Sequence, residues 1–320
     1  MHLLIPFAAS SSPACQQALE SLKLPHLEKL LGRLTLTHTD TADESSLTPP
    51  HERVHARALG LVARDGCVPW AARQAAQAGL HADLAQQAAS NAAWAWITPC
   101  HWHVHADYIV MGNPQTQGLE AAPSQTLLAA MRPFFEEDGI TLHYAAPTQW
   151  LARGEVFRDL ATASLDRVAG RDIDAWRPKT AQAAALRRLQ NEMQMLLYTH
   201  PLNDERAGHG LAPVNSFWVS GTGTLPAGWS EPAPSDLVMP QALREAALAG
   251  DWAAWVNAWQ QLDATECAAL LHALDAGQSV SLSLCGERSA LTFNGGRTGL
   301  LKKLMSQLGR QPLSSLRDKL

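Results

Sequence analysis

The chain has 320 residues, of which 46% are hydrophobic and 17% are charged, and its formal net charge at pH 7 is −5. A chain of this length and composition can bury a large core in one large domain or two. It contains no basic block of the kind that follows a nucleic-acid backbone and no apolar run close to the ~18 residues of a membrane span, so we expect neither a nucleic acid nor a membrane as a partner.

The N-terminal part predicts a strand, a turn and helices, which is the usual opening of an α/β sheet. Residues 3–9 read as a buried strand, because this apolar run is too short for a signal peptide and lacks a basic start. Ser12 is expected to cap a first helix, and a second helix is expected over 25–34. The polar stretch 35–50 predicts a loop, and a helix follows over about 51–61.

The segment around residue 100 has the most metal-like pattern in the sequence. His101, His103 and His105 alternate with Trp102 and Val104, so on a strand the histidines share one face. Two such imidazoles can reach one divalent ion, for which Zn, Cu or Ni is suitable. Two other interpretations remain open: a polar strand face that meets solvent or a cleft, and a site for an anionic ligand.

The middle of the chain predicts a helix over 124–137, a strand over 140–144 and then a turn-rich segment. In that segment Asp166, Arg167 and Arg171 can line an anion pocket, since the fork of arginine suits phosphate and carboxylate. A capped turn with a surface ion pair is the alternative.

The stretch 186–223 predicts an amphipathic helix that ends at His200, because the next residue is Pro201. Asn203 is then expected to cap a short charged turn that contains Arg206. A buried strand is expected over 214–219, followed by a glycine-rich turn at its carboxyl end, where ligands sit in open α/β sheets.

The C-terminal part predicts a loop over 225–240 and helix over 243–274. The tryptophans at 252, 255 and 259 follow helical spacing and predict a core stripe. A strand over 280–284 leads into a turn with Glu287 and Arg288.

These patterns together resemble a known family. Archaeal-type cofactor-independent phosphoglycerate mutases, of the alkaline phosphatase superfamily, have a helix ending in His-Pro-x-Asn, then an Arg, Pro-x-Asn, an apolar strand and Gly-x-Gly. The matching residues here are His200, Pro201, Asn203, Arg206, Pro213, Asn215 and Gly221 to Gly223. The whole chain is also similar to a proteobacterial family labelled RpfE-type regulatory proteins, which implies a regulatory role.

The sequence departs from the mutases where their chemistry resides. Ala8, Ala9 and Ser10 stand in place of the first metal-binding Asp, and His51 stands at the nucleophilic Ser. An imidazole does not simply replace a metal-bound serine nucleophile. Ser45, Ser46 or Thr48 replaces it only if the register slips. Glu287 and Arg288 stand in place of an Asp and a His ligand, and Arg does not bind metals at neutral pH.

The resemblance implies an α/β fold: an alkaline-phosphatase-like three-layer core of residues 1–90 and 224–320, with an inserted α+β domain of residues 91–223. It also implies a non-catalytic protein that binds a small anionic metabolite or a protein partner. The alternative is an active phosphoryl-transfer enzyme, a phosphoglycerate mutase or phosphatase, that uses a metal at the three strand histidines. The expected ligand-binding residues are Asp166, Arg167, Arg171, His200, Asn203, Arg206, Asn215, Ser216, Gly221, Gly223, Glu287 and Arg288.

The cofactor and location expected from the sequence follow from its cysteines and histidines. The five cysteines are scattered without a CxxC pair, which favours small buried thiols in a reducing, cytoplasmic compartment. We expect no cofactor, with a divalent metal at the histidine strand as the alternative.

Overall fold

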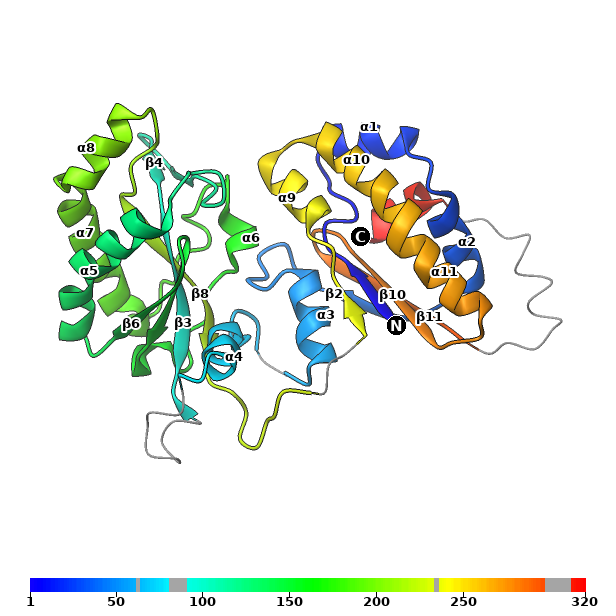
Figure 1. Ribbon diagram of the computed structural model, residues 1–320, viewed down its shortest axis with the longest axis horizontal. Coiled ribbons are helices and arrows are strands. Elements are labelled where there is room, and N and C mark those ends of the chain that lie inside the picture. The colour runs from blue at the N-terminus through cyan, green and yellow to red at the C-terminus, as the bar shows by residue number, and fades with distance from the viewer. Residues whose placement is uncertain (62–63, 81–90, 233–235, 297–311) are drawn as a thin grey trace. The chain divides into compact units, whose positions relative to one another are not determined.

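The chain folds into two compact units, which a computed structural model describes for residues 1–61, 64–80, 91–232, 236–296 and 312–320. Unit 1 comprises residues 1–44, 49–59 and 231–320, and unit 2 comprises residues 45–48 and 60–230 (Figure 1). Unit 2 is therefore inserted into the chain of unit 1. No helix in these ranges is long and apolar enough to cross a membrane.

Unit 1 is built from a sheet, flanking helices and short connecting turns. Its elements are β1 (His2–Ile5), α1 (Pro13–Ser21), α2 (Pro25–Arg33), β2 (Thr35–Thr41), α3 (Pro50–Ala58), β9 (Leu237–Val238), α9 (Ala242–Ala249), α10 (Trp252–Leu262), the π-helical turn η4 (Asp263–Cys267), α11 (Ala268–Asp275), β10 (Val280–Cys285), β11 (Ser289–Gly295) and the 3-10 helix η5 (Leu313–Lys319).

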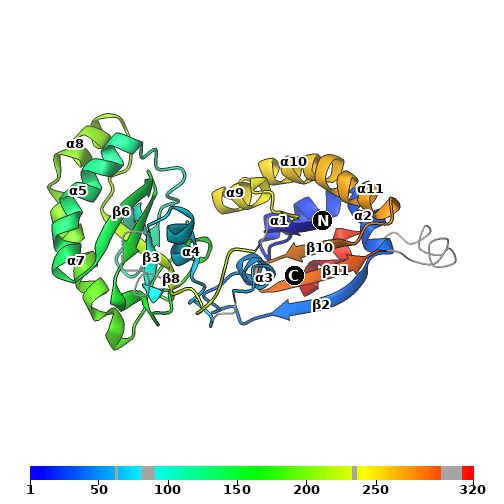
Figure 2. The same cartoon turned by 60° about the horizontal axis from the view of Figure 1, so that its bottom comes forward.

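The sheet of unit 1 has the strand order β2-β11-β10-β1-β9, with β1 parallel to β10 and β9. Successive side chains of β1 point to opposite faces. Leu3 and Ile5 pack with the helical layer formed by α1, α2, α10 and α11, whereas Leu4 packs with Val54 of α3 on the other face (Figure 2). The three-layer α/β core expected from the sequence is confirmed.

The expectation of a loop over 35–50 is wrong for its first half, because β2 forms there. This strand pairs antiparallel with β11 at the edge of the sheet, and Asp40 is the one buried residue along it. An edge strand is held by backbone hydrogen bonds and leaves its side chains in water. A polar, threonine-rich strand therefore lacks the apolar signal of a core strand.

The helical run near the C-terminus carries the core stripe that its tryptophans predict. Trp255 and Trp259 are fully buried, with their rings edge to face, and Trp252 packs against the same cluster. Gly250 adopts a left-handed conformation with φ of 68° and ends α9, and Asp251 caps α10 through a hydrogen bond to the amide of Ala254.

Unit 2 is an α+β unit around an antiparallel sheet. Its elements are α4 (Trp70–Gln77), β3 (Trp94–Cys100), β4 (Trp102–Val104), β5 (Ile109–Met111), α5 (Ala121–Glu137), β6 (Thr141–Ala146), β7 (Gln149–Arg153), η2 (Glu155–Phe157), α6 (Leu165–Val168), η3 (Ala181–Ala183), α7 (Ala184–Tyr198), α8 (Pro201–Gly208) and β8 (Ser216–Gly223). The strand order of the main sheet is β6-β7-β3-β8, and β4 and β5 form a separate hairpin.

The main sheet of unit 2 is covered on both faces. Helices α5 and α7 pack on one face with a core that includes Phe135, Trp150 and Phe217. On the other face, the alanines of α4 pack against Trp94 and Leu151. The inserted α+β domain is thus present, but α4 belongs to it rather than to the core, because its contacts are with β3 and β8. The expected boundary at residue 90 lies outside the described residues.

Two details of the stretch 186–223 differ from expectation. His200, rather than Asn203, caps α8, and its Nδ1 accepts a hydrogen bond from the amide of Leu202, since Pro201 fits the first helical position. Gly221 and Gly223 lie within β8 rather than beyond it. A register shift between Trp94 and Trp96 of β3 accommodates them in the ladder.

Candidate functional site

The carboxyl ends of β1 and β10 in unit 1 form the sheet edge where α/β folds place ligands. The chain turns sharply after β1 at Phe7, which has a positive φ of 52° although it is not a glycine. Its carbonyl accepts a hydrogen bond from Nε1 of Trp255 at 3.0 Å, and the amide of Ala8 donates to the carbonyl of Cys285 at 2.7 Å. These contacts stabilise a backbone conformation that is otherwise unfavourable, and they bring Ser10 and Ser11 to this edge.

Glu287, in the turn after β10, is held by the two serines. Ser10 donates its hydroxyl to Oε1 at 3.0 Å, and Ser11 donates its amide and its hydroxyl to Oε2 at 3.1 and 2.6 Å. Both carboxylate oxygens therefore accept hydrogen bonds from the loop after β1 that contains Ser10 and Ser11, here called the β1 loop. Donor groups in this position stabilise a carboxylate without any cation.

The other residues of this turn also make close contacts. Arg288 donates to a carboxylate oxygen of Glu44 at 2.9 Å, and its amide and that of Ser289 donate to the carbonyl of Leu320. A Cβ on Gly286 would lie 2.3 Å from that carbonyl oxygen, so glycine is required for the close approach.

The residues at this edge do not fit the paired metals that the mutase resemblance implies. Divalent cations such as Mn²⁺ and Mg²⁺ take oxygen and imidazole ligands. Here the position after β1 carries Ala8 and Ala9, which have no donor atoms, and Arg288 presents a guanidinium. Glu287 and Arg288 instead tie the β1 loop and Glu44 to the β10 turn.

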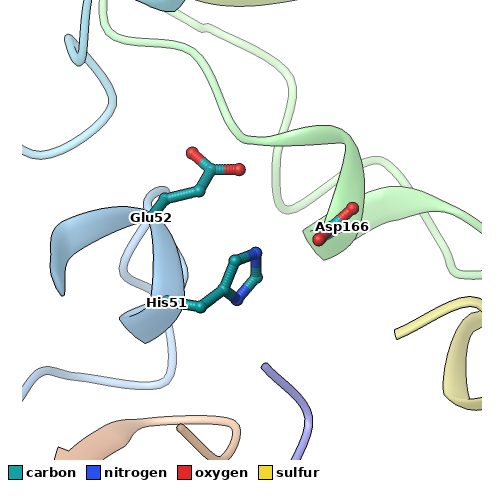
Figure 3. Close-up of side chains that lie close together, drawn as sticks. All are labelled: His51, Glu52 and Asp166. Carbon is teal, nitrogen blue, oxygen red and sulfur yellow. The ribbon is translucent and has the colours of Figure 1, made fainter. Parts of the chain in front are cut away.

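His51, expected at the nucleophile position, is buried in the first turn of α3, next to Glu52 (Figure 3). The ring of His51 lies 5.6 Å from the ring of Phe7. Figure 3 also draws Asp166, which lies on α6 in unit 2. An imidazole in this place provides no hydroxyl for phosphoryl transfer.

The hydroxyl groups that a register slip would offer are engaged inside unit 2. The one hydroxyl hydrogen of Ser46 is shared between a carboxylate oxygen of Asp65 at 2.9 Å and the carbonyl of Thr48 at 3.1 Å, and the Thr48 hydroxyl accepts from the amide of Gly66 at 2.8 Å. Burial raises the pKa of Asp65, but hydrogen bonds from Leu47, Thr48 and Ser46 outweigh it and leave the pKa below its ordinary value. These contacts anchor residues 45–48 to unit 2.

The three strand histidines divide into a pair and a single residue. The rings of His101 and His103 meet edge to face, with centroids 4.1 Å apart, while His105 stacks on Tyr108 at 4.4 Å. Nδ1 of His101 lies 2.9 Å from the carbonyl of Pro213. Burial, and then the nearby charges of His103 and Arg206, hold the pKa of His101 below its ordinary value despite that hydrogen bond.

Arg206 and Asn203 make framework contacts, whereas the sequence suggested that they face a ligand. The buried guanidinium of Arg206 donates to three carbonyls, those of Ala212, Gly118 and Gln117, at 2.9, 3.2 and 2.6 Å. The amide of Asn203 donates to the carbonyl of Val214 and its oxygen accepts from the Val214 amide. These two side chains join α8 to the segments beside it.

Other expected ligand residues have similar roles. Asn215 bonds through its side chain to the backbone amide and carbonyl of Trp102, at 2.7 and 2.9 Å. The side chain of Ser216 is fully buried in β8. Gly221 lies against the ring of Trp96, and Gly223 against Pro69. Their binding of a ligand stays a prediction.

The segment with Asp166, Arg167 and Arg171 carries two buried charged side chains and one exposed one. Ser164 caps α6, and Asp166 and Arg167 are buried on it, with the guanidinium of Arg167 5.8 Å from the ring centroid of Trp176. Arg171 is exposed, and its carbonyl accepts from the amide of Met111.

A cleft of about 700 Å³ lies at the opposite edge of the unit 1 sheet, near the amino ends of β1 and β10. No sequence pattern indicated it, because its polar residues are far apart in the chain. Nε2 of His2 lies 2.9 Å from the hydroxyl of Ser283, and burial and then the adjacent amino terminus lower the pKa of His2. The cleft is lined by Met1, His2, Ala58, Asp236, Leu237, Ser279, Val280, Ser281, Asn294, Gly295 and Gly296.

Sequence reasoning also missed the contacts that organise the β1 loop and the histidine pair. No pattern in the sequence indicated the contact of Ser11 with Glu287, 276 positions away. Pro213 was noted only as part of a family motif. Its carbonyl orients His101 across a separation of 112 residues.

No family model matches the chain, and the search of curated proteins found no match. Among solved structures, it is similar to the cofactor-independent phosphoglycerate mutase from Thermoplasma acidophilum DSM 1728. That match has 13% identity, covers 100% of this chain and 98% of the other, and has a TM-score of 0.35. It is also similar to the PH0037 protein from Pyrococcus horikoshii, with 11% identity, coverage of 96% and 91%, and a TM-score of 0.46.

Proposed function

We propose that this chain is a non-catalytic, phosphoglycerate-mutase-like protein that binds a small anionic metabolite or a protein partner in a regulatory role. The observation that carries the proposal is the engagement of Glu287, which accepts three hydrogen bonds from Ser10 and Ser11 at the carboxyl edge of the unit 1 sheet. The only acidic side chain at that turn thus serves to close the β1 loop.

Phosphoryl transfer needs charge compensation and a positioned nucleophile. Metal ions supply the first and activate the second in the metal-dependent enzymes that the motifs resemble. Here alanines follow β1, an arginine follows Glu287, and His51 occupies the nucleophile position. This set of side chains supports binding rather than turnover.

An anionic ligand is supported by the arginines of the α6 segment. Arg167 and Arg171 lie four residues apart around a short capped helix, and guanidinium groups bind phosphate and carboxylate in a bidentate manner. The regulatory role and the cytoplasmic location rest on the resemblance to RpfE-type proteins and on the cysteine pattern.

An assay of 3-phosphoglycerate conversion tests the absence of catalysis. We expect the purified full chain to show no turnover above the protein-free background with added Mn²⁺ or Mg²⁺. Metal-dependent turnover that is abolished by His51→Ala or Ser46→Ala would contradict the proposal. Turnover abolished by His103→Gln would favour the alternative, an enzyme with a metal at the strand histidines.

Thermal-shift screening tests the ligand class. We expect phosphorylated or carboxylated metabolites to raise the melting temperature of the wild type, and Arg167→Ala or Arg171→Ala to reduce that shift. Lys179→Ala is the matched control, because Lys179 is an exposed cation in the same unit. If hits shift all four proteins equally, these arginines do not contact the ligand.

A further inference from the structure

The hairpin β4–β5 in unit 2 brings two imidazoles together on one side. His101 directly precedes β4 and His103 lies within it, while the intervening Trp102 is 2% exposed and faces the interior. Alternation along an extended chain therefore puts both histidines on the opposite face. Their rings meet edge to face with centroids 4.1 Å apart, so two imidazoles, which are ligands that suit Zn, Cu and Ni, lie side by side.

The backbone around the pair determines the tautomer of His101. A carbonyl oxygen only accepts hydrogen bonds, so the 2.9 Å contact with Pro213 means that Nδ1 of His101 carries the proton. In the neutral ring, Nε2 then carries the lone pair. Metal-binding histidines almost always donate their second ring nitrogen to a carbonyl or carboxylate in this way.

The pair is also open to an incoming ion. His103 is exposed and His101 half-buried. Gly112, which directly follows β5, donates its amide to the carbonyl of His101 at 2.8 Å. A Cβ at this glycine would lie 3.6 Å from Nε2 of His103. The glycine therefore leaves space beside the rings that any side chain would begin to fill.

We propose that His101 and His103 bind one transition-metal ion of the Cu(II), Ni(II) or Zn(II) type, through Nε2 of His101 and a ring nitrogen of His103. His105 does not belong to this site, because its ring stacks on Tyr108. With two protein ligands, the remaining coordination positions are left to water or to an anion. The positively charged guanidinium of Arg206 lies nearby. It donates hydrogen bonds to three carbonyls, and their dipoles offset its charge.

This inference is independent of the proposed function, because it concerns a metal ion on the histidine pair and neither the anionic ligand nor the absence of turnover. Calorimetric titration of the chelator-stripped full chain with NiCl₂ and ZnSO₄ tests it. We expect one equivalent to bind to the wild type, and His103→Gln and His101→Gln to weaken that binding at least tenfold. His105→Gln, two residues along the same hairpin, is the matched control and should retain wild-type affinity within about twofold.

A second measurement reads the ligands directly. In nitrogen-detected NMR of the histidine side chains, Zn²⁺ should shift the ring signals of His101 and His103 and leave that of His105 unchanged. If His101→Gln fails to fold, the exposed His103→Gln variant and this spectrum still test whether the histidine pair binds the metal. The absence of binding, equal loss in all three variants, or shifts spread over many histidines would overturn the proposal.

Discussion

Ser11 donates both its amide and its hydroxyl to one carboxylate oxygen of Glu287, at 3.1 and 2.6 Å, across 276 positions of sequence. This contact joins the loop after the first strand to the turn after β10. A double-mutant cycle of Ser11→Ala and Glu287→Ala should give a coupling energy of roughly 0.5–1.5 kcal/mol, the range of a hydrogen bond in a partly exposed site. Denaturant unfolding measures it, and a coupling of zero would mean that the contact does not stabilise the loop.

Arg206→Ala should destabilise unit 2 by about 3 kcal/mol, because one buried hydrogen bond to the Gln117 carbonyl and two partly buried ones to Ala212 and Gly118 are lost, each contributing about 1 kcal/mol. Arg206→Lys should recover only part of this loss, since an ammonium does not reproduce the guanidinium fork. Lys179→Ala is the control, and thermal or chemical unfolding is the measurement. A melting point equal to that of wild type would contradict the framework role.

Gly221→Ala should cost more stability than Gly60→Ala, although both glycines have a left-handed backbone with φ of 62° and 68°. The backbone term is common to both and amounts to roughly 1–2 kcal/mol. At Gly221 the new methyl group would also lie 2.9 Å from Trp96, whereas at Gly60 it meets nothing within 4 Å. Comparison of the two unfolding curves isolates the contact with Trp96, and equal losses would show that the ring moves freely.

Asp40 predicts a pH dependence of stability. Burial raises the pKa of Asp40, but hydrogen bonds and charge from Arg57 and Arg53 outweigh it, so that the pKa lies below the ordinary value of 3.8. A depressed pKa stabilises the fold above the unfolded-state value, and this contribution is lost as the pH falls through the folded-state value.

Asp40→Asn should therefore cost roughly 1.5–3 kcal/mol at pH 7. The difference from wild type should shrink below about pH 3.8, the ordinary value. Urea unfolding at pH 7, 5 and 3 measures it, with Asp275→Asn, an exposed partner of Arg33, as the control. A difference that stays constant down to pH 3 would show that the carboxylate charge is not what stabilises the pair.

The elements with a strong local signal were predictable from the sequence. Ser12 caps α1 with Pro13 at the first helical position, as expected, because capping and proline geometry act within four residues. The apolar alternation of β10 and the tryptophan spacing of α10 likewise reflect burial against a core, which periodicity reports directly. Strand β2 gave no such signal, since its pairing partner rather than its side chains decides its conformation.

The candidate site was less predictable than the fold, and the strand histidines show why. Their alternation placed them on one face, but only the folded hairpin separates His105, stacked on Tyr108, from the pair. The sequence predicts that Arg206 and Asn203 bind a ligand, and the contacts of these side chains in the structure are with the protein backbone. Their partners are backbone carbonyls and amides, which every residue provides and no sequence motif marks.

By itself, the sequence determined the α/β class, the buried tryptophan stripe and the Ser12 cap of the first helix, because each of these depends on residue type and local spacing. The tertiary structure alone decided that Glu287 is closed by Ser10 and Ser11, that α4 packs on the inserted unit, and that Pro213 fixes the tautomer of His101. Contacts of this kind join residues far apart in the chain, and their energy depends on three-dimensional approach, which local propensity does not encode.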